Sequence, residues 1–197
     1  MNNLLNESMK NYVDSLSSGS GTPGGGNAIG VVCSFACALM LMSLRIAVLK
    51  KGGDVADSLE LQKTLEDIQK KCFFLAEKDS EKFKNVLAKW KKGGSELESA
   101  LKESAEVSLD IAEICLELLQ HIDMQDLSRY TMIMTDVGIA VELANACFSG
   151  AVMNYKINVK GIKNQVVFNN LKKIRNRVFG EFEDLYSKLS EKIKSLI

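Results

Sequence analysis

The chain has 197 residues, which suits one domain with one hydrophobic core, and we expect a single domain over residues 1–197. Its 25 basic and 25 acidic side chains cancel, so no long-range field favours nucleic acid or an anionic membrane as a partner. No secretory-signal pattern opens the sequence, and its five cysteines include no CxxC pair. We therefore expect a cytoplasmic protein with reduced, buried thiols, no disulfide framework and no metal site.

The first helix is predicted from a stripe of apolar residues between Leu5 and Leu16, which ends in a run of serine and glycine. An apolar helix from about Asn27 follows, and its residues 28–44 carry no charge. This stretch of 17 residues is shorter than the roughly 20 that cross a bilayer. No second segment of this kind is evident, so we interpret it as the central helix of a bundle, with a membrane span as the alternative.

The remaining chain has helical periodicity with two glycine pairs as breaks. Gly52 and Gly53 end the apolar helix, and Asp54 is a candidate cap for a helix over 54–90. After Gly93 and Gly94, Ser95 and Glu98 have the spacing of a capping box. Three more helical segments are predicted, at 95–120, 127–156 and 164–195. Six long helices with short connections indicate an all-α bundle.

The stretch GTPGGGN contains the only proline of the chain, Pro23, followed by three glycines. Proline fixes its own φ, the glycines are free to take positive φ, and Asn27 is placed to cap the next helix. Such a turn presents backbone amides at a helix N-terminus, where anions bind. Taken alone, the pattern fits a flexible loop with an N-cap equally well.

Five segments in the same order together resemble the cyclodeaminase/cyclohydrolase family of folate enzymes. They are the Thr-Pro-Gly-Gly-Gly turn, DSEKF, AEVSLDIAE, TDVGIAVELANA and NYKIN, and the resemblance covers about residues 5–165. The chain departs from the family pattern at Ser108, where proline is usual, at Asn27, where serine or alanine is usual, and in the segment KWKK.

The resemblance implies a homodimer with its ligand near the subunit interface and a tetrahydrofolate derivative as substrate. It implies that Asp79 is the catalytic acid/base; by its spacing alone, Asp79 would be a solvated carboxylate paired with Lys82. The implied substrate-binding residues are Thr22, Pro23, Gly24, Gly25, Gly26, Asn27, Asp136, Asn154 and Asn158.

Asp136 is also a candidate on its own pattern, because it is the only acid between Leu127 and Val141. If it faces inward it needs a strong partner, and the amino group and ring amide of a pterin offer two donors. The alternatives are a pair with Arg129 or a cap at a local break. Asn154 and Asn158, one turn apart, either bond a ligand or end their helix.

The expected function is hydrolysis of 5,10-methenyltetrahydrofolate to 10-formyltetrahydrofolate. We prefer it because the sequence carries no formimidoyltransferase domain to supply a formimino substrate. The first alternative is a formimidoyltetrahydrofolate cyclodeaminase that releases ammonia. The second, from another class, is a catalytically inactive helical folate-binding or interaction protein; Ser108 and KWKK favour it, whereas Asp79, Asp136 and the complete turn oppose it.

Overall fold

The computed structural model of the protein describes residues 8–51 and 55–197, and every regular element within these ranges is helical. The predicted all-α bundle is therefore confirmed. The elements are α1 (Met9–Ser17), α2 (Gly25–Lys51), α3 (Val55–Trp90), α4 (Gly94–Asp123), the 3₁₀ helix η2 (Leu127–Ile133), α5 (Met134–Val159) and α6 (Gln165–Lys194).

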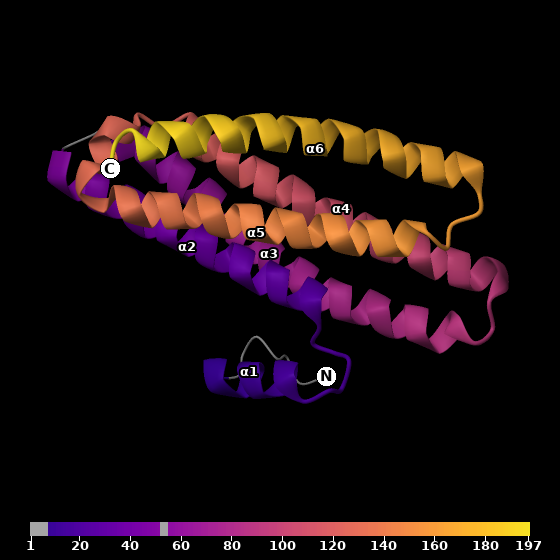
Figure 1. Ribbon diagram of the computed structural model, residues 1–197. Helices are drawn as coiled ribbons and strands as arrows, with labels where there is room; N and C mark the ends of the chain where they lie inside the picture. The colour runs from indigo at the N-terminus through magenta and orange to yellow at the C-terminus, as the bar shows by residue number, and fades with distance from the viewer. Residues whose placement is uncertain (1–7, 52–54) are drawn as a thin grey trace.

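Helices α2 to α5 form an antiparallel four-helix bundle. α2 packs against α3 and α5, and α4 packs against the same two helices, which closes the bundle. α6 lies along α4 and α5, while α1 stands apart beside the start of α2 (Figure 1). The N-terminus of α2 and the C-terminal halves of α3 and α5 therefore share one end of the molecule.

Two glycines let α2 approach its neighbours closely. A Cβ on Gly30 would lie 2.9 Å from the Cβ of Ala76 on α3, and a Cβ on Gly150 of α5 would lie 2.7 Å from Cγ2 of Ile29. Both separations are shorter than ordinary van der Waals contact. These contacts fix the register of α2 against α3 and α5 near its N-terminus.

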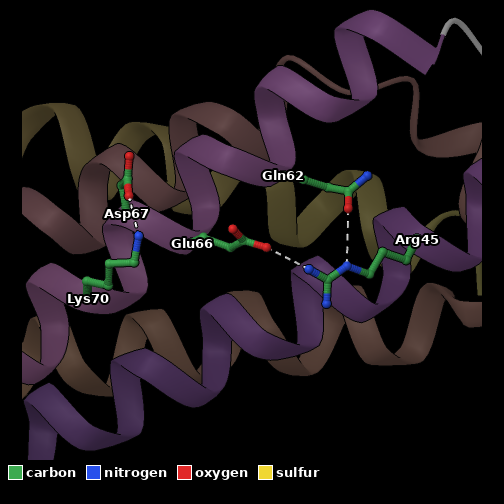
Figure 2. Close-up of polar contacts among 5 residues, drawn as sticks. All are labelled: Arg45, Gln62, Glu66, Asp67 and Lys70. Carbon is green, nitrogen blue, oxygen red and sulfur yellow. Dashed lines mark hydrogen bonds and ion pairs between the residues drawn. The ribbon is translucent and has the colours of Figure 1, made fainter.

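An ion pair on the surface links α2 to α3 farther along (Figure 2). Arg45 donates from Nε to Gln62 at 3.2 Å and from Nη2 to Glu66 at 2.7 Å. Lys70 pairs within α3 with Asp67 at 2.8 Å. Exposed pairs of this kind contribute roughly 0–1 kcal/mol. The buried apolar core holds the helices together.

Several helix ends differ from the sequence predictions. The predicted capping box is wrong: α4 begins at Gly94 after Gly93, which has a φ of 65° and provides no side-chain cap. Glu98 instead accepts a hydrogen bond from the backbone N–H of Asn164 at 2.5 Å. Asn164 caps α6 through its side chain, and the segment predicted from 127 opens as the 3₁₀ helix η2. Leu5, the predicted break at Gly52 and Gly53, and the candidate cap Asp54 lie outside the described residues.

Two stretches are long and apolar enough to span a membrane. The most apolar 18 consecutive residues within 25–49 have a mean hydropathy of 2.2 and are 56% buried, and those within 127–159 have a mean hydropathy of 1.3 and are 39% buried. The second stretch contradicts our expectation that no other segment of this kind exists. Both contribute to the bundle core through residues such as Cys37, Met40 and Ala144, all at most 1% exposed.

Candidate active site

The glycine-rich turn leads from α1 into the first turn of α2. Gly19 and Gly21 each have a φ of 78°, whereas Gly24, Gly25 and Gly26 do not take positive φ. The three consecutive glycines, which the sequence left free to take positive φ, therefore do not use that freedom. They lie at the start of a helix, where their conformation is ordinary.

Gly26 is required by a close approach to Asp79 on α3. A Cβ on Gly26 would overlap the carboxylate of Asp79, whereas a Cβ on Gly25 would meet nothing within 4 Å. The backbone N–H of Asn27 donates a hydrogen bond to this carboxylate. The Asp79 side chain therefore lies at the positive end of the α2 dipole, beside amides with no acceptor within the helix.

Asn27 does not cap α2, since the helix begins at Gly25. Its side chain is 2% exposed and joins three elements. Oδ1 accepts from the hydroxyl of Tyr12 on α1 at 2.7 Å, and Nδ2 donates to the carbonyl of Ala76 on α3 at 2.8 Å. These two bonds hold α1 and α3 against the start of α2, and so fix the amide that contacts Asp79.

The environment of Asp79 suits proton transfer near neutral pH. Burial raises the pKa of its carboxyl to about 6, against the lowering effect of the Asn27 amide. Lys82, the partner expected from sequence spacing, pairs instead with Glu103 at 3.2 Å and Glu81 at 3.4 Å. A carboxyl with this pKa exists in both protonation states around neutrality, as an acid/base requires.

An apolar pocket of about 560 Å³ lies at the same end of the bundle. Phe83 lies one helical turn after Asp79, and its Cε1 is 3.9 Å from where a Cβ on Gly21 would stand. It therefore connects the glycine-rich turn to the pocket. The other lining residues are Val86, Leu87, Trp90, Leu101, Ile157, Asn158, Lys160 and Gly161. Apolar walls with few polar groups are typical of sites for flat organic ligands.

Sequence reasoning did not identify this pocket. The sequence did contain a signal for the pocket, because the spacing of Phe83, Leu87 and Trp90 places three large apolar side chains on one face of α3. In the structure each of the three is more than a third exposed. The tryptophan belongs to the segment KWKK, in which the chain departs from the family pattern.

The predicted binding residues fall at two ends of the bundle. Asn158 lines the pocket and donates to the hydroxyl of Ser104 at 3.0 Å, and Asn154 lies half-buried one turn earlier. Asp136 lies in the first turn of α5, roughly 20 Å along the helix from Gly150 at 1.5 Å per residue. Within one chain, the turn, Asp79 and Asn158 therefore lie at the same end of the bundle, whereas Asp136 lies toward the other end.

Residues 8–177 match the family model described as formiminotransferase-cyclodeaminase. The chain belongs to this family. Over 98% of both chains it is 24% identical to a methenyltetrahydrofolate cyclohydrolase of Methylorubrum extorquens. The crystal structure of a formiminotetrahydrofolate cyclodeaminase from Thermotoga maritima matches with a TM-score of 0.91 and 27% identity, again over 98% of each chain. The relatives thus include both activities that we considered from sequence.

Proposed function

We propose that the protein hydrolyses 5,10-methenyltetrahydrofolate to 10-formyltetrahydrofolate, with Asp79 as its acid/base. The observation that carries this proposal is the half-buried Asp79 carboxyl, whose pKa is about 6 and which lies against the first turn of α2. The full-length similarity to a named cyclohydrolase supports this choice of reaction.

The reaction needs one group that takes a proton and returns it. Water adds to the methenyl carbon, and the Asp79 carboxylate takes one proton from it, leaving a neutral carbinolamine. As the bond from this carbon to N5 breaks, protonated Asp79 gives that proton to N5. The hydroxyl proton leaves to solvent as the formyl C=O forms on N10. The carboxylate also stabilises the cationic amidinium of the substrate electrostatically.

A cyclodeaminase reaction would use the same carboxyl differently. N10 would attack the formimino carbon, and Asp79 would carry the N10 proton to the departing ammonia. The structural similarity to a named cyclodeaminase favours this second candidate. An inactive binding protein is disfavoured. Burial raises the pKa of Asp79, so the ionised carboxylate lowers folding stability, and a protein without catalytic activity has no use for such a residue.

The deciding experiment follows the loss of methenyltetrahydrofolate absorbance with purified protein, with Asp79→Asn as the matched control and the formimino compound in a parallel assay. Hydrolysis above the spontaneous rate by the wild type alone supports the proposal. Ammonia release without hydrolysis would assign the deaminase reaction instead. Equal rates in both variants would remove Asp79 from the mechanism.

We also propose that the chain forms a homodimer through α2. The outward side of this helix carries apolar residues spaced alternately by four and three, a pattern typical of helices that pair. Phe35, Met42 and Leu49 are 40%, 39% and 86% exposed in the single chain. The full stripe is Ala28, Val32, Phe35, Leu39, Met42, Ile46 and Leu49. We infer that a second copy covers it, not lipid.

If the α2 helices of the two subunits pack antiparallel, Asp136 of the partner subunit would reach the end of the bundle where Asp79 lies. α5 runs antiparallel to α2, so Asp136 lies toward the C-terminal half of α2. In such a dimer the twofold axis is perpendicular to α2 and passes near its middle. It therefore places Asp136 of the partner subunit beside the N-terminal half of α2, where Asp79 lies. The proposed site thus combines Asp79 of one chain with Asp136 of the partner subunit.

Mixed dimers test this arrangement. Asp79→Asn and Asp136→Asn are each expected to be inactive, and random mixing of the two gives heterodimers with one intact site, or about a quarter of wild-type activity. Activity that stays at the level of the separate variants would place both acids in the same chain or remove Asp136 from the site.

A further inference from the structure

All five cysteines of the chain converge on one level of the bundle core. α2 contributes Cys33 and Cys37, and α3, α4 and α5 contribute one each: Cys72, Cys115 and Cys147. All five are free thiols, and none is more than 2% exposed. We call these five residues the cysteine layer. Every helix of the four-helix bundle takes part in it.

The sulfur atoms lie at distances that suit one metal ion. The Sγ atoms of Cys33, Cys37 and Cys72 lie within 4.8 Å of one another, and the Sγ atoms of Cys33 and Cys115 are 3.8 Å apart. Thiolates bound tetrahedrally at a Zn–S distance of about 2.3 Å are about 3.8 Å apart. Adjustments of no more than about 1 Å would therefore bring the sulfur atoms of Cys33, Cys37 and Cys72 to this spacing.

Packing alone does not explain why the thiols gather. The same helices use alanine where they need a small buried residue, as at Ala36, Ala76, Ala112 and Ala144, which are at most 1% exposed. Small residues that only fill space in the core have no reason to gather at one height along the bundle axis. Cysteine differs from alanine in its sulfur, which is a soft ligand for metal ions.

We propose that Cys33, Cys37 and Cys72 bind one thiophilic metal ion, with Cys115 as the fourth ligand when the ion requires one. Within the described residues this group contains only sulfur ligands, which select Cu(I) or Zn²⁺ over magnesium or calcium. The ligands lose their thiol protons on binding, so uptake releases protons. The layer is buried, so we expect the ion to enter as the chain folds. Once bound, it would link α2, α3 and α4.

The test is refolding of the full-length chain in the presence of each ion. Reduced protein is unfolded in guanidinium chloride with a chelator, and then refolded with Zn²⁺ or with Cu(I) buffered by a weak competing ligand. After desalting, metal content and the thermal unfolding midpoint are measured. We expect one retained ion per chain from one of the two arms, and a higher midpoint than the metal-free chain, because the ion binds only the folded state.

Variants then assign the ligands. Cys33→Ala and Cys72→Ala are expected to retain at least tenfold less metal than the wild type. Cys147→Ala, an equally buried member of the layer outside the three-residue group, should retain it. Equal retention by Cys72→Ala overturns the assignment, as does a metal-free wild type in both arms. Loss of two hydrogens in the intact mass with no bound ion would identify a disulfide and also overturn it. If Cys33→Ala does not fold, the metal content and the unfolding midpoint of the wild type decide.

Discussion

The carboxylate of Asp79 occupies the space that a Cβ on Gly26 would need. We expect Gly26→Ala to displace this carboxylate and to lower turnover at least tenfold. The clash involves only the end of a flexible side chain, and alanine favours helix, so the melting temperature should stay within a few degrees. Gly25→Ala, which meets open space, is the matched control and should keep normal turnover. A Gly26→Ala variant with unchanged kinetics would show that the position of the carboxylate does not limit the reaction.

Asp79 is expected to transfer a proton in the chemical step. Asp79→Asn keeps the shape and an acceptor for the Asn27 amide but cannot exchange a proton at neutral pH. We expect kcat to fall about 100-fold or more, with folate affinity changed only a few-fold, because proton transfer contributes roughly 10²–10⁴ to rate. Steady-state kinetics and a folate titration separate the two effects. A large loss of affinity with near-normal kcat would make Asp79 a binding residue.

The same carboxyl should make stability depend on pH. Its pKa rises from 3.8 to about 6 on folding, so the folded state binds the proton more tightly than the unfolded chain. Stability is therefore lost as pH rises from about 4 to about 6, and stays lower above that window. Asp79→Asn removes this cost and should be more stable than the wild type by about 1–3 kcal/mol at pH 7.5. Denaturant unfolding at pH 4 should show little difference between them.

The link between Tyr12 and Asn27 should anchor α1. Tyr12→Phe keeps the ring but leaves the buried Oδ1 of Asn27 without its donor. An unpaired buried acceptor costs about 1–3 kcal/mol, and we expect the free energy of unfolding to fall by that amount. Val13→Ala, on the exposed side of α1, should change it by less than about 0.5 kcal/mol. Equal effects would mean that the hydrogen bond is dispensable.

The proposed α2 interface makes a prediction about mass in solution. Phe35→Glu places a charge in the middle of the stripe, and light scattering at micromolar concentration should then report a monomer. Phe74→Glu on α3, at a position 62% exposed against 40% for Phe35, is the control and should stay dimeric. A monomeric wild type would contradict the interface itself.

Helical periodicity was sufficient to predict the bundle, because this signal is local in sequence. The details that failed depend on distant residues. Glu98 was expected to cap its own helix, but it contacts Asn164, 66 positions away. Asn27 was expected at a helix cap, but Tyr12 and the carbonyl of Ala76 hold its side chain inside the molecule. No spacing rule reveals these partners.

The glycines of the turn show the same limit at the site. Gly24 to Gly26 were identified as free to take positive φ, but positive φ occurs in this turn at Gly19 and Gly21. Gly26 is required by the side chain of Asp79, 53 positions later. Asp79 itself was identified only through the family motif. Its spacing to Lys82 predicted a solvated pair, and burial against the start of α2 is a tertiary property.

The contacts that position the Asp79 carboxyl all lie within one helical hairpin, α2 and α3, with α1 as its brace. Gly26, Asn27, Gly30 and Ala76 are contributed before the chain reaches α4. The connections among α4, α5 and α6 take no part in this arrangement. A circular permutant with new termini in the α5–α6 connection would therefore preserve the acid/base unit intact. The apolar pocket beside Phe83 also needs α4 and α5, so its formation would report separately on the packing of the rest of the bundle.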